Sequence, residues 1–498
     1  MRTWFKNANI WGLTGDEFWV EDGKFVSGGD GEVVDLAGKY VMPGFVDAHC
    51  HILPTGLDLL KLHLGKCQTK EQVLDAVRDE VGKGEGWLHA VHYDQTKFAD
   101  AKHLSKDDLD AISTSRPILL RHSNGHASVA NSAALIWASV DESTPDPAGG
   151  EYVRDASGRL TGVLLERAHE HVTDSAPRPT TEEMTLAILA AADKMSALGI
   201  TAATDMMTGR WHLADEIDAY EAAANRGAKI RFRLCMQWAR VFGPRGMGAD
   251  AVRERLASLE ESQVRPIGIK IFADGAIGSA SAAIHGTFLT TGGNGQLIYA
   301  PDRLNAMVRE AHEAGFAVAT HAIGDRAVDL VMDAYEATGQ PDRHRVEHAM
   351  ILSDAQIDRL KRLGLHVTMQ PEFLVRFGHA YRKQLPPETA SRIKRFRSVL
   401  DAGIPLSFSS DRPIVPGNPW DGITCAVARP EGFDDSENIG LQKAIDLYTR
   451  QGALANGEPR SMGEITPGAW ADFQVYDRLP APISSPSAVY KGGVQVRP

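Results

Sequence analysis

The feature that most constrains the fold of this chain is a repeated alternation between short apolar runs and longer amphipathic segments. Eight apolar runs of strand length recur between residues 44 and 410. Helical patterns separate them, and two of these, at 181–199 and 302–315, end on glycine as helices often do. This order favours parallel strands joined by helices, and eight such units fit a closed (β/α)₈ barrel. We therefore predict an α/β TIM barrel with strands at 44–49, 199–205, 230–237, 267–274, 317–321, 344–349, 365–370 and 404–410.

The length of the chain predicts parts beyond the barrel. Its 498 residues exceed one hydrophobic core, because single cores stop growing at roughly 250–300 residues. Residues 1–40 and 463–498 contain short β-type runs with Gly and Asp turns, so we predict that both chain ends form one small β-sandwich domain. Residues 41–462 are the predicted barrel domain. Within it, about 52–198 is too long for one strand-to-helix connection and is predicted to be an insertion over the barrel mouth.

The charge and hydropathy of the chain argue against several classes of partner. A net charge of −12 disfavours a nucleic-acid partner, because phosphate binding needs a concentrated basic surface. The short basic run 392–397 is interpreted as a solvated helix face. Residues 275–301 are uncharged but rich in Gly, Ser and Thr, so no membrane span is predicted. The first residues do not resemble a signal peptide, and we expect a cytoplasmic protein that acts on a small molecule and can form a homo-oligomer.

Histidines and one aspartate close several of the predicted strands. His49 and His51 lie two residues apart at the end of the first strand, so both side chains face the same way. An HxH pair alone is weak, because many buried histidines only complete a core hydrogen bond. However, His321, His348 and Asp411 also lie at predicted strand ends, and the C-terminal strand ends of a barrel meet at one face. This set predicts a site for one or two divalent ions, with zinc the expected metal.

Longer motifs give the chain a resemblance to a known family. They include MPGFVDAHCH (42–51), IKIFADGAIGSASAA (269–283), THAIGDRAV (320–328) and SSDRPIVPGNPW (409–420). In these motifs the chain resembles the amidohydrolase superfamily over nearly its whole length. Within that superfamily it is most similar to amidohydrolase family 3, the branch of the N-substituted formamide deformylases and related metal-dependent hydrolases. The resemblance implies a hydrolase acting on carbon–nitrogen bonds other than peptide bonds.

The resemblance also implies roles for individual residues. His49 and His51 correspond to ligands of a first ion, and His321 and His348 correspond to ligands of a second. Asp411 is expected both to bind metal and to act as the catalytic proton shuttle. The implied reaction is attack of metal-activated hydroxide on an amide-type carbonyl, after which Asp411 returns the proton to the leaving nitrogen.

Several further residues have two interpretations each. Lys270 ends the fourth strand, where several family members have a carboxylated lysine bridging two metals; the alternative is an amine paired with an acid such as Asp274. Arg121 and His126, in the motif RHSNGH of the insertion, resemble substrate-binding positions, and structural hydrogen bonding is the alternative. Asp205 ends the second strand and Asp274 follows the fourth, and each is expected to cap a following helix rather than to catalyse.

Two other functions compete with the amidase. One is a metal-dependent deaminase of a heterocyclic amine, and the other is a barrel scaffold that has lost catalysis. Deaminases of this superfamily commonly have Glu three residues after the histidine of the fifth strand, whereas this chain has Gly324 there and Asp325 next. Asp325 is expected mainly to serve a turn or to orient a ligand. The scaffold requires a degraded ligand set, and this chain retains every position named above.

Overall fold

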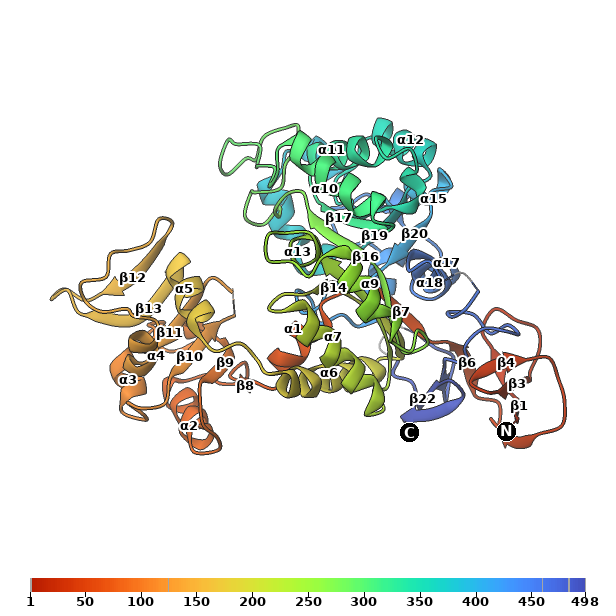
Figure 1. The fold of residues 1–498 in the computed structure, drawn as a ribbon, viewed down its shortest axis with the longest axis horizontal. Helices are drawn as coiled ribbons and strands as arrows, with labels where there is room; N and C mark the ends of the chain where they lie inside the picture. The colour runs from red at the N-terminus through yellow and green to blue at the C-terminus, as the bar shows by residue number, and fades with distance from the viewer. Residues whose placement is uncertain (1, 124, 459, 482–483, 498) are drawn as a thin grey trace. The chain divides into compact units, whose positions relative to one another are not determined.

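The computed structural model describes residues 2–123, 125–458, 460–481 and 484–497, and a parallel barrel is its central feature (Figure 1). Among these residues, eight strands follow one another in chain order, and each neighbouring pair is parallel. The backbone N–H of Asp411 donates to the carbonyl of His49 at 2.7 Å and joins the last strand segment to the first. The α/β barrel prediction is thereby confirmed, with all eight strands overlapping their predicted ranges. The barrel strands are β7 (Phe45–Cys50), β14 (Ile200–Thr208), β15 (Arg231–Gln237), β16 (Val264–Phe272), β17 (Val318–Ala322), β18 (Arg345–His348), β19 (His366–Met369) and β20 (Leu406–Phe408).

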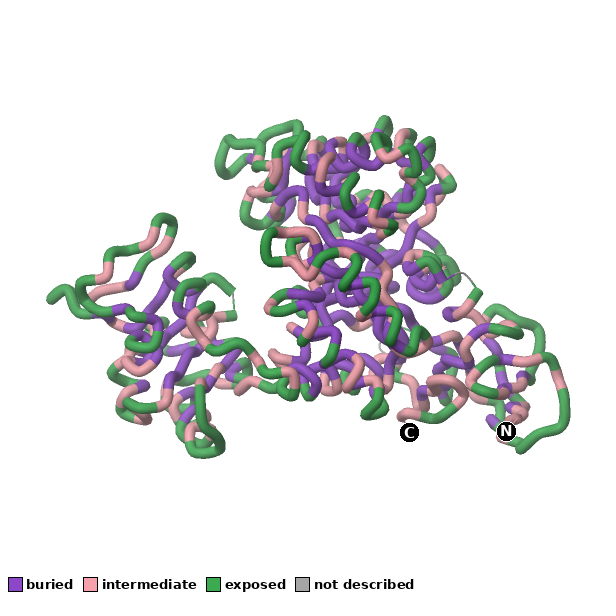
Figure 2. The backbone as a smooth tube through the Cα atoms, viewed as in Figure 1, coloured by how far each residue is buried: buried purple, intermediate pink, exposed green. Residues whose placement is uncertain are grey.

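Amphipathic helices connect the barrel strands. The predicted helices are α6 (Thr181–Ser196) and α10 (Pro301–Glu313), and the glycines beyond them, Gly199 and Gly315, have φ of 80° and 87°. Only glycine adopts such angles without a steric cost. Figure 2 shows buried strands and helices that expose their outer faces. None of the helices in the described ranges is both long and apolar enough to span a membrane. Further helices are α7 (Leu213–Asn225), α8 (Trp238–Val241), α9 (Ala249–Ala257), α11 (Asp325–Glu336), α12 (Asp354–Leu363), α13 (Glu372–Gln384), α14 (Pro387–Ala390), α15 (Phe396–Asp401), α16 (Pro419–Val427), α17 (Leu441–Leu447) and α18 (Arg450–Ala455).

The two chain ends form two sheets around a shared aromatic core. Phe5 stacks on Phe18 with ring centroids 4.9 Å apart, and Phe473 from the other chain end meets Phe18 edge-on at 5.1 Å. Apolar contacts of this kind stabilise a sandwich of two sheets. One sheet has the order β4 (Lys24–Val26), β3 (Phe18–Glu21), β1 (Thr3–Lys6), β5 (Glu32–Asp35). The other has the order β2 (Asn9–Ile10), β6 (Tyr40–Pro43), β21 (Phe473–Tyr476), β22 (Ala488–Lys491), β23 (Val494–Arg497).

Residues 56–187 form a second compact unit with its own sheet and cores. The two ends of this unit are in contact: a Cβ added at Gly56 of α1 (Ile52–Leu59) would lie 1.8 Å from the carbonyl oxygen of Ala187 in α6. Glycine is therefore required where these helices cross. The sheet has the order β12 (Gly150–Arg154), β13 (Leu160–Glu166), β11 (Ala127–Ala130), β10 (Ile118–His122), β9 (Leu88–Tyr93), β8 (Leu62–His63). Its helices are α2 (Lys70–Val81), α3 (Lys106–Asp110), α4 (Ser132–Trp137) and α5 (Arg167–Ser175).

Candidate metal centre

Three of the predicted ligands converge where β7 ends. His49 is the penultimate residue of β7, His51 follows that strand, and Asp411 follows β20. Asp411 Oδ1 lies 2.9 Å from His51 Nε2 and 3.5 Å from His49 Nε2. All three side chains are buried, and one ligand atom from each lies within 4.8 Å of the others. Within the described ranges, this is the one group of three or more His, Cys and acidic residues with that spacing.

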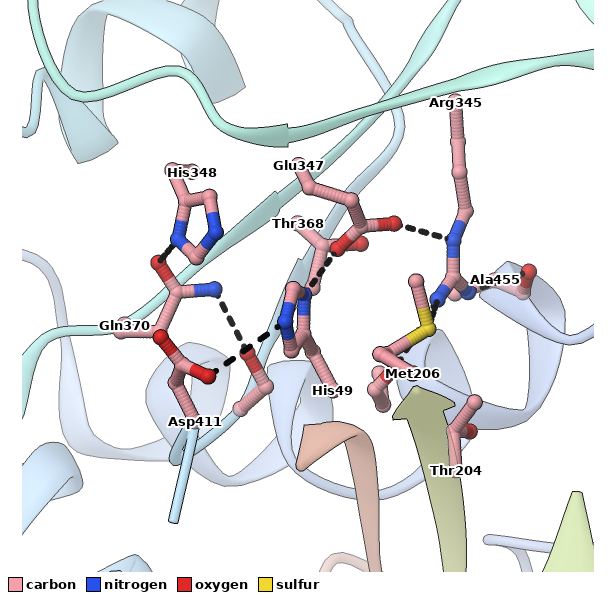
Figure 3. A network of polar contacts seen from close by, with 12 residues as sticks. His49, Thr204, Met206, Arg345, Glu347, His348, Thr368, Gln370, Asp411 and Ala455 are labelled. Carbon is pink, nitrogen blue, oxygen red and sulfur yellow. Dashed lines mark hydrogen bonds and ion pairs between the residues drawn. The ribbon is translucent and has the colours of Figure 1, made fainter. Parts of the chain in front are cut away.

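A buried carboxylate orients His49. Glu347 Oε2 lies 2.6 Å from His49 Nδ1, and Glu347 Oε1 lies 2.5 Å from Nε of Arg345 (Figure 3). A carboxylate accepts the Nδ1 proton, so the lone pair of the neutral ring is on Nε2, the nitrogen that faces Asp411. The local structure thus selects the tautomer that a metal ligand needs.

His348 is oriented in a similar way by an amide. Its Nδ1 lies 2.8 Å from Oε1 of Gln370, the residue that follows β19. Its ring centroid is 4.8 Å from that of His49 and 4.5 Å from that of His321. The backbone of His348 has φ of 72°, which is sterically costly for a residue with a Cβ. The rings of His49 and His348 are buried and the partly buried His321 ring packs against them, and Nε2 of His348 is left for a ligand.

His321 is held by the loop that follows β16. Its Nε2 lies 3.0 Å from the carbonyl oxygen of Gly275 and 3.4 Å from Asp274 Oδ1, so Nδ1 is the ring nitrogen left for a ligand. Asp274 also accepts hydrogen bonds from the backbone N–H groups of Ala283 and Gly324, at 2.9 and 2.8 Å. Its carboxylate thus organises the surrounding loops rather than pairing with an amine. The alternative pairing of Asp274 with Lys270 is not observed.

Lys270 lies on β16 with 1% of its surface exposed. Its Nζ has no hydrogen-bond partner within the described part of the chain and lies 4.9 Å from the centre of the Phe272 ring. Burial lowers the pKa of Lys270, although Glu347 and Asp411 act in the opposite direction. An orphaned buried amine is costly, and modification or a bound charged group would relieve that cost.

The electrostatics of the cluster fit a divalent cation. Burial lowers the pKa values of His49 and His348 well below the usual value, so both rings are neutral and each keeps a lone pair. Burial acts to raise the pKa of Asp411, but His49, His51 and Lys270 hold it below its usual value. Asp411 Oδ1 faces the Nε2 atoms of both His51 and His49. Neutral imidazoles and an ionised carboxylate are ligands of zinc-type ions.

The two predicted substrate-binding residues belong to the compact unit 56–187. Nη2 of Arg121, on β10, lies 2.5 Å from Oδ2 of Asp58. Nδ1 of His126 lies 3.0 Å from Oε2 of Glu166, and both side chains are largely exposed. Each residue therefore has a structural partner within its own unit.

Two other predicted acids have structural roles. Asp205 Oδ2 accepts from the backbone N–H groups of Ile52 and Leu53, at 3.1 and 3.2 Å, where α1 begins. Asp325 Oδ1 accepts from the backbone N–H of His285 at 2.9 Å. Asp205 therefore binds the N-terminus of α1, a helix that precedes it in the chain, and Asp325 joins the start of α11 to the loop at His285.

Three polar residues around the cluster were missed in the sequence analysis: Glu347, Gln370 and Lys394. Glu347 and Gln370 lie in or next to apolar strand segments. The only sequence signal at such positions is a polar residue within a run of apolar residues. The interpretation of 392–397 as a solvated helix face is wrong at Lys394, which is 0% exposed and precedes α15. Lys394 turns inward because Gln370 and a backbone carbonyl accept its N–H groups, and burial lowers its pKa to about 7.

Comparison with known proteins decides the family. The amidohydrolase family model matches residues 32–497. The chain belongs to the amidohydrolase family. This amidohydrolase is 31% identical to YtcJ of Bacillus subtilis (strain 168) over 468 residues, which are 91% of this chain and 86% of YtcJ. It is 29% identical to N-substituted formamide deformylase from Arthrobacter pascens over 474 residues, 91% of this chain and 86% of the deformylase.

A solved structure agrees with the fold of this amidohydrolase. A crystal structure of an uncharacterized metal-dependent hydrolase from Pyrococcus horikoshii OT3 matches with a TM-score of 0.82 and 24% identity, covering 99% of this chain and 100% of the other. At this identity the match supports the barrel architecture. Family membership makes the chain a metal-dependent hydrolase acting on carbon–nitrogen bonds, as the motifs predicted.

Proposed function

We propose that this amidohydrolase cleaves an amide-type C–N bond of a small molecule at the site formed by His49, His51 and Asp411. The observation that carries the proposal is the convergence of their ligand atoms within 4.8 Å of one another. His321 and His348 are proposed as further ligands, because each ring has one nitrogen engaged and the other without a hydrogen-bond partner among the described residues. Zinc is the proposed ion because imidazole and carboxylate donors suit it.

Asp411 is proposed as the proton shuttle. A bound divalent cation would supply an activated water nucleophile and polarise the substrate carbonyl. Asp411, ionised by its neighbours, accepts a proton from the attacking water and then donates it to the leaving nitrogen. Protonation is needed because an amine leaves poorly as an anion. Glu347 supports this step by holding the His49 ring with its Nε2 toward Asp411.

Lys270 is proposed to be carboxylated and to bridge two ions. A lysine carbamate forms when the neutral amine attacks carbon dioxide and the nitrogen releases a proton, and burial lowers the pKa of Lys270 toward the neutral form. The carbamate on Nζ would have two carboxylate oxygens next to the histidine rings, and these oxygens would bind the two ions.

The deaminase alternative is less well supported. A Cβ added at Gly324 would lie 1.9 Å from the carbonyl oxygen of Ala283, so a glutamate does not fit there. Asp325, the substitute acid, already accepts from the backbone of His285. Both observations favour the amide hydrolase over the deaminase.

The substrate class is proposed from the relatives and the insertion. One relative carries the name N-substituted formamide deformylase, which favours N-formyl and N-acyl amines as first candidates. Arg121 is a proposed substrate contact because its guanidinium has N–H donors beyond the one directed at Asp58. His126 is proposed alongside it, on the strength of the same motif.

A substrate panel tests the proposed function. Zinc-loaded protein is assayed with N-formyl amines, N-acyl amines, lactams, carbamates and aminated heterocycles, with chelator-treated protein as the control. We expect carboxylate and amine release from at least one amide class, and no ammonia from the heterocycles. Ammonia release alone would establish the deaminase, and zinc-loaded protein inactive on every class would contradict the amidase.

A further inference from the structure

A buried chain of polar contacts connects Lys394 to His348. Lys394 Nζ donates to Gln370 Oε1 at 2.9 Å and to the backbone carbonyl of His348 at 3.1 Å. The same Oε1 lies 2.8 Å from His348 Nδ1, and Gln370 Nε2 donates to Ser409 Oγ at 3.0 Å. Lys394, Gln370 and Ser409 are fully buried, and His348 is nearly so. Figure 3 shows Gln370 between His348 and Asp411.

The order of donors and acceptors in this chain is fixed by Lys394. Ser409 Oγ, which donates to the carbonyl of Met369 at 3.4 Å, accepts from Gln370 Nε2, so the NH₂ side of the amide faces Ser409. As an ammonium, Nζ of Lys394 has only N–H donors, and a backbone carbonyl can only accept. The second N–H therefore meets the Gln370 oxygen, so the amide cannot present its NH₂ group to His348. His348 must then donate from Nδ1, which leaves the lone pair on Nε2.

The backbone of Lys394 is also held in place. Its φ is 51°, a conformation that is energetically unfavourable for a non-glycine residue. Arg429 Nη1 donates to the carbonyl of Lys394 at 2.8 Å, and Arg429 Nη2 donates to that of Ile393 at 2.7 Å. The backbone N–H of Lys394 donates to Met350 at 2.8 Å. The surrounding structure therefore stabilises an unfavourable conformation that turns this side chain inward.

We propose that Lys394 and Gln370 are positioning residues that lock His348 in the Nδ1–H tautomer, the form in which Nε2 can bind a metal ion. The inference rests on the proposed role of His348 as a ligand. Lys394 thus has a role inside the protein, although its place in a run of basic residues suggests an exposed side chain. Without Lys394, rotation of the Gln370 amide by half a turn would place NH₂ opposite Nδ1 and favour the tautomer that cannot bind through Nε2.

Rotation of the Gln370 amide can be tested by a rescue experiment. Lys394→Met removes the donor, and Lys394→Met combined with Gln370→Glu supplies an acceptor with two equivalent oxygens, which cannot be misoriented. We expect Lys394→Met to weaken zinc binding about 10- to 100-fold, the usual effect of losing an outer partner of a metal-bound histidine. The double variant should recover most of that loss. Lys443→Met, at an exposed lysine, is the matched control.

Two readouts separate this role from a structural one. Zinc affinity is measured by chelator competition, and the tautomer of His348 is measured in metal-free protein by ¹⁵N NMR of labelled histidine, assigned with His348→Asn. We expect Nδ1–H in the wild type and the double variant, and a larger Nε2–H population in Lys394→Met. Unchanged affinity and tautomer in Lys394→Met would overturn the proposal, and so would a loss that Gln370→Glu does not restore in a protein of wild-type thermal stability. A wild type that hydrolyses nothing would contradict the proposed function without affecting the tautomer result.

Discussion

Individual residues of the candidate centre have backbone angles that amino acids with a Cβ seldom adopt. His348 and Asp411 have φ of 72° and 59°, and Lys394 has φ of 51°. Glycine would adopt these conformations at lower energy. A strained residue is therefore present at each position because its side chain is needed there. Strain of this kind is typical of functional sites, and here it occurs in two candidate ligands and in the lysine behind one of them.

The first residue-scale prediction concerns Asp411. Asp411→Asn keeps an oxygen that can face the ion but removes the group that accepts and returns the proton. We expect kcat to fall by about 10²–10⁴-fold, the usual contribution of general acid–base catalysis, while most of the metal remains bound. Steady-state kinetics and elemental analysis of the same sample measure both quantities. Activity within tenfold of the wild type would exclude Asp411 as the shuttle.

The second residue-scale prediction concerns Lys270. Lys270→Ala removes the orphaned amine and any carbamate on it, so we expect fewer metal ions per chain if that carbamate bridges two ions. Elemental analysis after dialysis measures the stoichiometry. Lys229→Ala, at a partly exposed lysine, is the control. A Lys270→Ala protein with wild-type stoichiometry and rate would show that the lysine does not bridge.

At the scale of elements, a buried histidine links the starts of two barrel strands. His344, just before β18, accepts a hydrogen bond at Nδ1 from the backbone N–H of Val318 in β17 at 3.0 Å, and its Nε2 lies 3.1 Å from His312 Nδ1. Burial, with smaller effects of His312 and Arg343, lowers the pKa of His344 to about 3. The neutral ring is therefore part of the folded structure.

This histidine should make folding stability depend on pH. The unfolded imidazole binds a proton near pH 6.5 and the folded one near pH 3, so unfolding free energy falls as pH drops through this window. One proton corresponds to about 1.4 kcal/mol per pH unit. In His344→Asn, whose amide oxygen can still accept from Val318, the slope of urea-measured stability between pH 6 and pH 4 should be smaller by up to that amount. Identical slopes in both proteins would contradict the prediction.

The elements could be predicted from sequence more completely than the contacts among them. The barrel strands were predictable because length and apolar content are local properties, although 404–410 pairs only over Leu406–Phe408. Pro405 lacks an N–H to pair, and the positive φ of Asp411 turns the chain beyond the strand. The five ligand candidates were predictable because they mark strand ends. The Glu347–His49 contact was not predictable, because it joins residues 298 positions apart on different strands.

At the scale of the whole molecule, one buried ion pair ties the β-sandwich to the barrel. Arg231 of β15 donates to both carboxylate oxygens of Asp472, at 2.6 and 3.0 Å, and both residues are 1% exposed. The guanidinium also lies 4.4 Å from the ring centre of Trp470. The C-terminal strands thereby contribute to the stability of the barrel that the middle of the chain forms.

Removing one partner should be costly. Asp472→Ala leaves the Arg231 charge buried and unpaired, and we expect a loss of about 3–5 kcal/mol in urea denaturation. Asp193→Ala breaks an exposed pair with Lys229 and should cost about 1 kcal/mol or less. If both variants lost the same small amount of unfolding free energy, the buried Arg231–Asp472 pair would not be what ties the β-sandwich to the barrel.

The contact between Gly56 and Ala187 has a consequence for how such enzymes diversify. The first and last residues of the compact unit 56–187 lie next to each other. Recombination can therefore lengthen, shorten or replace this unit without changing the strands that carry the histidines. Changes in this compact unit and changes in the candidate metal centre can therefore be inherited separately, so related chains can acquire new versions of the unit while keeping the same barrel.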